Sequence, residues 1–167
     1  MADVYIWLYA KKMAFRLSVS TRIKWLATCL VLVAAQARAA VFINPAEAFR
    51  ESARLRRPVL LIFSGSDWCV PCIQFQKKVL DDSGFQRYAA DNLVLLEADF
   101  PQRRRIPDSL AAAYDALAAK YNASGAFPKL LLLGGDGAVI AETPWQHGPA
   151  ADFIRLLQGL AKNYAPR

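Results

Sequence analysis

The sequence predicts an α/β domain built on a mixed four-stranded sheet with helices on both faces. Three observations support this prediction. Short apolar runs of strand length alternate along the chain with stretches of helical periodicity. The first strand, the helix after it and the second strand form the kind of unit that joins parallel strands. Near the end of the chain, a glycine-rich turn separates two further strands, as in an antiparallel hairpin.

The predicted domain begins with a helix and a buried strand. Asn44 and Pro45 are suited to an N-cap and a first helical turn, and apolar residues recur at helical spacing up to Arg56. Pro58 ends this helix. The continuous apolar run 59–63 predicts a strand that is buried on both faces, because a strand with one solvated face would alternate apolar and polar residues.

The later elements are placed by the same criteria of periodicity and turn residues. They are a helix at 70–80, a short helix at 83–90, a strand at 93–98, a helix at 108–122, strands at 129–133 and 138–142, and a helix at 149–163. Asp108 is expected to cap the helix that it begins. Trp145 is expected to pack in the core, and His147 to be exposed.

Residues 1–39 have the pattern of an export signal. Basic residues precede an uncharged apolar run at 25–35, and Ala37 and Ala39 supply the small residues of a cleavage site. This run is shorter than the about 20 residues that a membrane span needs. We expect cleavage after Ala39 and a mature domain of residues 40–167 in the periplasm or another extracytoplasmic compartment. An uncleaved membrane anchor is the alternative.

The basic charge of the chain is concentrated in this signal. The formal net charge is +7, but residues 1–39 hold six basic residues and one Asp, so residues 40–167 carry only +2. The adjacent arginines 103–105 lie in a proline-bounded loop and are expected to be solvated, with docking of an acidic partner as the alternative. We therefore expect no nucleic-acid partner.

The cysteines point to redox chemistry. Cys29 lies in the signal, which leaves Cys69 and Cys72 in the mature domain. A structural disulfide framework would use more cysteines, further apart. A zinc site would need two more ligands where the chain has only His147, and haem attachment would need His in place of Ile73. We expect a redox dithiol, with no metal and no cofactor.

The position of Cys69 at the start of a helix favours its thiolate form. An unperturbed thiol of pKa about 8.5 is only a few per cent ionised at pH 7, and the thiolate is the nucleophile. Unpaired backbone N–H groups and the helix dipole stabilise an anion at this position by roughly 0.3–2 kcal/mol. Cys72 lies one turn further along and is expected to be more buried. Cys69 is thus predicted to attack and Cys72 to resolve the mixed disulfide.

At these residues the chain resembles the thioredoxin superfamily, and the loop before the cysteines resembles that of exported members. The resemblance extends from about residue 44 to 162. It consists of the strand ending at Phe63, the segment Trp68-Cys69-Val70-Pro71-Cys72 at the start of a helix, Phe127-Pro128 before a strand, the turn at Gly137, and Gly148 ahead of the last helix.

The resemblance implies a thioredoxin fold and a thiol:disulfide oxidoreductase that reduces protein disulfides. It also implies that Pro128 is cis and lies against the cysteine pair, with the backbone of Phe127 binding the substrate strand. Trp68 and Pro71 would support the active site. The partners implied are protein thiols and disulfides, together with a membrane thiol protein as electron donor. We expect a monomer.

Two other functions fit the same fold. One is a disulfide oxidase or isomerase, although Pro71 is shared with thioredoxin and favours the reducing side. The other is a redox-inert binding or chaperone module. The intact cysteine pair, together with Trp68 and Pro128, counts against such a module because it would not need both thiols.

The chain departs from thioredoxin in how it would handle protons. Thioredoxin has a buried Asp below the second cysteine, where this chain has Ile62 or Phe63, and a nearby Lys where it has about Leu95. Deprotonation of Cys72 is therefore left to solvent or to another carboxylate. The candidates are Glu97, Asp99 and Asp67.

Overall fold

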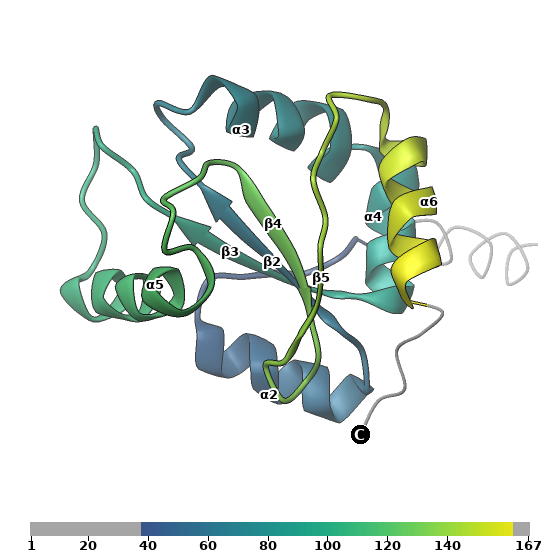
Figure 1. Cartoon of the computed structure of the whole chain (residues 1–167), viewed down its shortest axis with the longest axis horizontal. Coiled ribbons are helices and arrows are strands. Elements are labelled where there is room, and N and C mark those ends of the chain that lie inside the picture. The colour runs from purple at the N-terminus through teal and green to yellow at the C-terminus, as the bar shows by residue number, and fades with distance from the viewer. Residues whose placement is uncertain (1–37, 162–167) are drawn as a thin grey trace, which may run out of the picture. The chain divides into compact units, whose positions relative to one another are not determined.

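The computed structural model describes residues 38–161 (Figure 1). The predicted apolar run of the signal and Cys29 lie outside the described residues, as does the predicted end of the last helix at residue 163. Within the described range, no helix has the length and apolar character needed to cross a membrane.

A mixed sheet forms the centre of the domain, with the strand order β1-β3-β2-β4-β5. Strands β2 (Val59–Ser64) and β3 (Val94–Asp99) are parallel along their whole lengths. Strand β4 (Lys129–Leu133) runs antiparallel to β2, and β5 (Val139–Glu142) runs antiparallel to β4. The predicted α/β class and the C-terminal hairpin are thus confirmed.

A fifth strand was not predicted. Strand β1 (Val41–Phe42) lies at the edge of the sheet and pairs in parallel with β3, Val41 opposite Leu95 and Phe42 opposite Leu96. Two residues are too few to show the alternation by which a strand is recognised in a sequence. The sheet therefore has five strands rather than four.

The helices cover both faces of the sheet, as predicted (Figure 1). On one face, α2 (Pro45–Leu55) and α5 (Asp108–Tyr121) pack on the sheet. The opposite face carries the remaining helices: α3 (Val70–Phe75), the π-helix η1 (Gln76–Leu80), α4 (Ser83–Asn92) and α6 (Ala150–Ala161). Because side chains alternate along a strand, Ile62 of β2 packs under α3 while Phe63 packs on the α5 side.

One predicted helix cap is confirmed and the other is wrong. The Asn44 side chain accepts hydrogen bonds from the amides of Ala46 and Glu47, at 2.9 and 3.4 Å. Pro107, and not Asp108, occupies the N-cap position of α5, and its side chain makes no capping hydrogen bond. Asp108 has already entered the helix, where its carboxylate lies near the positive end of the dipole.

The helix that follows the cysteines is anchored by an aromatic cluster. Phe75, only 1% exposed, makes edge-to-face contacts with Trp145 and Phe153, at centroid distances of 5.4 and 5.3 Å. The predicted packing of Trp145 is confirmed. After Phe75 the helix widens into η1, where the amide of Asp81 donates to the carbonyl of Gln76 in the i to i+5 pattern of a π-helix.

Replacing Phe75 tests this anchor. We expect Phe75→Ala to lower the free energy of unfolding by about 3–5 kcal/mol, because it leaves a cavity between α3 and α6. The matched control is Val70→Ala on the same helix. Val70 is 63% exposed, so its change should stay within about 0.5 kcal/mol. Urea denaturation monitored by circular dichroism measures both, and equal losses for the two variants would contradict the anchoring role.

Candidate functional site

Cys69 and Cys72 are joined by a disulfide at the junction of β2 and α3. The two sulfurs are 2.01 Å apart and the two Cα atoms 5.2 Å apart. Each residue is 4% exposed, so in this disulfide form the expectation that Cys72 is more buried than Cys69 is wrong. Both sulfurs instead lie just beneath the surface, at the point where the chain leaves the sheet.

The sulfur of Cys69 takes the place of a helix-capping oxygen. Cys69 is the N-cap residue of α3, and its Sγ accepts a hydrogen bond from the amide of Cys72 at 3.2 Å. Pro71 lies in the first turn, where its missing N–H leaves no helical hydrogen bond unmade. A thiolate formed on Cys69 would accept this N–H bond and face the positive end of the helix dipole.

Trp68 links the cysteine loop to two other segments. Its indole Nε1 donates to the carbonyl of Phe100 at 2.7 Å, and its ring meets Phe127 edge-on at a centroid distance of 5.3 Å. The ring also lies over Gly65, where an added Cβ would come within 2.4 Å of it. Only glycine fits at residue 65 without displacing the tryptophan.

The peptide bond between Phe127 and Pro128 is cis, as the resemblance implied. It immediately precedes β4, which pairs with β2. Through the contact of Phe127 with Trp68, the structure brings the cis-proline segment to the loop that carries Cys69. His147 is exposed, as expected, and its ring lies 4.5 Å from that of Trp145.

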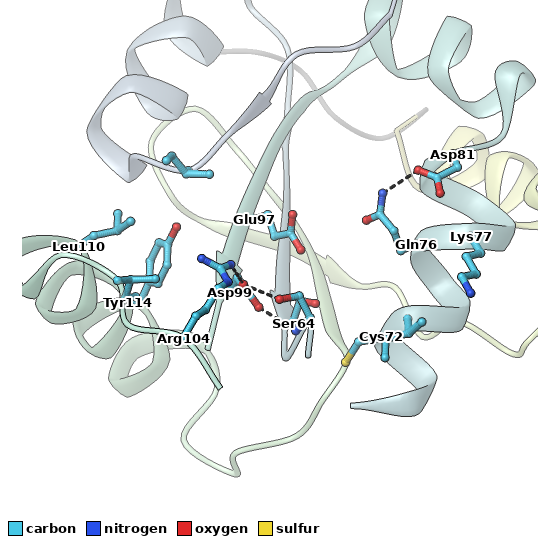
Figure 2. Close-up of a pocket in the computed structure, with 14 residues that line it drawn as sticks. Ser64, Cys72, Gln76, Lys77, Asp81, Glu97, Asp99, Arg104, Leu110 and Tyr114 are labelled. Carbon is cyan, nitrogen blue, oxygen red and sulfur yellow. Dashed lines mark hydrogen bonds and ion pairs between the residues drawn. The ribbon is translucent and has the colours of Figure 1, made fainter. Parts of the chain in front are cut away.

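A cavity of about 450 Å³ opens beside Cys72 (Figure 2). Strands β2 and β3, the helical segment after the cysteines, the loop after β3 and helix α5 all contribute to its walls. The polar and ionisable residues that line it are Ser64, Ser66, Gln76, Lys77, Asp81, Glu97, Asp99, Arg104 and Tyr114.

Two of the three candidate carboxylates hold loops in place. Asp99, 8% exposed, accepts hydrogen bonds from the amide and the hydroxyl of Ser66 at 2.8 and 2.7 Å, and it forms an ion pair with Arg104. Asp67 is bound by the amides of Gln102 and Arg103 at 2.9 and 2.7 Å. The hydrogen bond from Gln102 is the main reason that the pKa of Asp67 is lowered.

These contacts also revise the expectation for the arginines 103–105. Arg104 keeps an exposed side chain, but its guanidinium is paired with Asp99 at the cavity wall. The loop after β3 is therefore tied to the cysteine loop by both carboxylates. The arginine run is not a simple solvated linker.

Glu97 is the third carboxylate, and it lies opposite Ile62 in the register of β2 and β3. Burial raises the pKa of Glu97, and the negative charge of Asp99 raises it further. A hydrogen bond from Ser64 and the charge of Arg104 act in the opposite direction. The balance leaves a carboxylate that binds a proton more readily than an exposed glutamate does.

Tyr114 completes the cavity and was missed by the sequence analysis. It is 2% exposed, and burial, followed by the charges of Glu97 and Asp99, raises its pKa to about 12. The sequence signal that could have identified Tyr114 was its position on the buried face of the alanine-rich helix α5. Arg104 was likewise treated only as part of a basic run, because its pairing with Asp99 depends on the folded loop.

Comparisons with known proteins agree with this geometry. A family model described as thioredoxin-like matches residues 40–134. The chain is 32% identical over 117 residues to the disulfide bond reductase DsbH of Chlamydia pneumoniae, covering 70% of each chain. It is 31% identical over 87 residues to the thioredoxin-related protein DsbJ of the same organism, covering 52% of this chain and 25% of that protein.

Solved structures show the same similarity. A structure of DsbH oxidoreductase superposes with a TM-score of 0.72 at 30% identity, covering 78% of this chain and 89% of that one. A thioredoxin from Thermus thermophilus superposes with a TM-score of 0.55 at 19% identity, covering 75% and 89%. The second likeness shows that the fold is shared, and the predicted thioredoxin fold is confirmed.

The close approach of Gly65 to Trp68 yields a prediction. Gly65→Ala should lower the free energy of unfolding by about 1–3 kcal/mol, because the new methyl group forces the indole to move. It should also alter tryptophan fluorescence. Gly159→Ala in α6 is the control: nothing lies within 4 Å of an added Cβ there, and alanine favours a helix by roughly 0.8–1 kcal/mol over glycine. Similar stability changes in the two variants would show that Gly65 is not sterically constrained.

Proposed function

We propose that this chain, which belongs to the thioredoxin superfamily and is a thiol:disulfide oxidoreductase, reduces disulfide bonds of exported proteins. The observation that carries the proposal is the Cys69–Cys72 disulfide at the start of α3. Cys69 is the N-cap of α3 and Cys72 lies within its first turn, so the pair closes a disulfide across the start of the helix and can store and release two electrons. In the reduced pair, Cys69 is the cysteine that the helix N-terminus activates.

The reaction proceeds in two exchanges. The Cys69 thiolate attacks one sulfur of a substrate disulfide, forming a mixed disulfide and releasing the other substrate sulfur as a thiolate. Cys72 then loses its proton and attacks the Sγ of Cys69. The second substrate sulfur leaves as a thiolate, and the Cys69–Cys72 disulfide forms. Two electrons pass from the protein dithiol to the substrate disulfide.

Apolar residues around Cys69 provide a surface for the substrate. Val70, immediately after the nucleophile, is 63% exposed, and Trp68, immediately before it, contacts the ring of Phe127. We propose that the backbone at Phe127 and Pro128 binds the substrate strand. Trp68 and Pro71 hold the cysteine loop in its conformation. An extended protein segment on this surface would bring its disulfide to Cys69.

The reducing direction is supported by two observations. The curated relative that is 32% identical over 117 residues is named a disulfide bond reductase. Pro71, the residue before Cys72, is shared with thioredoxin, whose potential is about −270 mV. A reductase outside the cytoplasm must be reduced again after each cycle. We propose that a membrane thiol protein supplies these electrons.

Export is proposed from residues 1–39. Cleavage after Ala39 would begin the mature chain at Ala40. In the structure Ala39 is half-buried, and its amide donates to the Gln86 side chain at 3.0 Å. Cleavage after Ala39 would remove this contact, whereas an uncleaved membrane anchor would keep it. The mass of the chain recovered from the periplasm of a bacterial host should correspond to residues 40–167; the mass of the full chain, found in the membrane, would contradict cleavage.

The direct test of function is the reduction of insulin disulfides. The purified protein with dithiothreitol as electron source should precipitate reduced insulin, and Cys69→Ser should be inactive because it lacks the nucleophile. Cys72→Ser should form a mixed disulfide with the substrate that persists on a non-reducing gel. In the full-length chain, Cys29→Ser is the matched control and should behave like the full-length wild type. Equal turnover by Cys69→Ser and the wild type would exclude the mechanism, and inactivity of both would favour a redox-inert binding module.

A further inference from the structure

We propose that Glu97 accepts the proton that Cys72 loses when it resolves the mixed disulfide. The proposal rests on the function proposed above and adds the group that carries out its proton transfer. It also explains how the chain works without the buried Asp of thioredoxin. Of the two residues expected at that position, Ile62 is the one on the α3 side of the sheet.

The resolving step needs a base because Cys72 cannot rely on solvent alone. It is 4% exposed, and a thiol held away from water ionises less readily than an exposed one. Even an exposed thiol is only a few per cent ionised at pH 7. The neighbouring helix N–H group does not help, because the amide of Cys72 points to the sulfur of Cys69.

Of the three candidate carboxylates, Glu97 is the one that remains available for this task. A further carboxylate of the cavity, Asp81, is exposed and accepts a hydrogen bond from Gln76 at 2.7 Å. Asp99 is engaged by Ser66 and Arg104, which hold both of its oxygens. Asp67 does not line the cavity and is bound by the backbone of the next loop. Glu97 lines the cavity together with Cys72.

The arrangement places the acceptor between the two walls of the cavity. In Figure 2 the Glu97 side chain lies next to Ser64, with Asp99 and Arg104 on one side of it and the helix that carries Cys72 and Gln76 on the other. The cavity of about 450 Å³ has room for water molecules, each of which needs at least about 10–15 Å³. A proton can therefore pass from Cys72 to Glu97 through water.

Burial, more than the surrounding charges, raises the pKa of Glu97 and makes it a stronger base than a surface glutamate. From its own strand, Asp99 repels the carboxylate charge, while Arg104 from the following loop attracts it. Tyr114 from α5 and Lys77 and Asp81 from the η1 side complete the ionisable groups of the cavity. Burial is the largest of the causes that raise the pKa of Glu97. The higher pKa brings the proton affinity of Glu97 closer to that of a thiol.

In the resolving step, each bond that forms replaces one that breaks. The proton leaves Sγ of Cys72 and binds the Glu97 carboxylate, while the Cys72 thiolate forms a bond to Sγ of Cys69. The bond between Cys69 and the substrate sulfur breaks, and its electron pair leaves with the substrate. Glu97 then gives this proton to the substrate thiolate or to water, which returns Glu97 to its ionised form.

The rates of the two exchanges can be measured separately with the chromogenic disulfide dithiobis-nitrobenzoate. Attack by Cys69 on the reagent releases one coloured thiolate at a rate that depends on reagent concentration. Resolution by Cys72 releases the second at a rate that does not. Stopped-flow absorbance on the reduced, purified protein between pH 5 and pH 9 gives both rates. Cys69→Ser should lose the concentration-independent phase and react only slowly, through direct attack by the buried Cys72; if it reacts like the wild type, the proposed function fails irrespective of Glu97.

Glu97→Gln should leave the rate of the first phase unchanged and slow the second phase by about tenfold to a hundredfold at neutral pH. A positioned general base accelerates a reaction by a factor of about this size or larger. Wild-type resolution should fall as pH drops through the raised pKa of Glu97, because the protonated acid cannot accept a proton. Glu97→Gln should lack this inflection and simply follow ionisation of Cys72. Glu97→Asp, which keeps a carboxylate, should restore the inflection in part.

Glu47→Gln, an exposed glutamate on α2, is the matched control and should change neither phase. A second phase in Glu97→Gln that matches the wild type at every pH would overturn the proposal. So would equal slowing of both phases, because that would show a disturbance of the whole site rather than of the resolving step. The first phase also reports in each variant whether the site around Cys69 is intact.

Discussion

The parallel pairing of β2 with β3 is the constraint on which the rest of the site depends. The two strands stay in register to their last residues, where Ser64 lies opposite Asp99. The loops that follow β2 and β3 therefore leave the sheet side by side, at the carboxyl ends of the strands. Asp99 binds Ser66 in the loop after β2 and Arg104 in the loop after β3. These bonds fix the short connection that places Cys69 at the first turn of α3. The reactivity of Cys69 thus depends on a buried ladder of hydrogen bonds.

The sequence predicted those parts of the site whose structure is set by residues close together along the chain. A buried apolar run followed by a polar loop and a helix start places Cys69 and Cys72 without knowledge of the fold, and the family resemblance adds Pro128. The cavity depends instead on long-range contacts. Tyr114 and Arg104 reach it from a helix and a loop whose packing is set by the folded sheet. Strand β1 was missed for a different reason, since two residues carry no periodicity.

The departure from thioredoxin has a physical explanation in this cavity. An apolar Ile62 under the active-site helix improves packing against Phe75 and its cluster but leaves no carboxylate on β2. The register of the two strands puts Glu97 directly beside that position. A carboxylate moved from one parallel strand to its neighbour still faces the same helix. The chemistry of the fold can therefore be preserved while the residue that performs it changes strand.

The central claim is that the Cys69–Cys72 pair donates electrons, and its reduction potential tests this most directly. The protein is equilibrated with mixtures of reduced and oxidised glutathione, quenched with acid and separated into dithiol and disulfide forms. We expect a potential close to that of thioredoxin, about −270 mV. A potential near −120 mV, which is typical of strong disulfide oxidants, would contradict it.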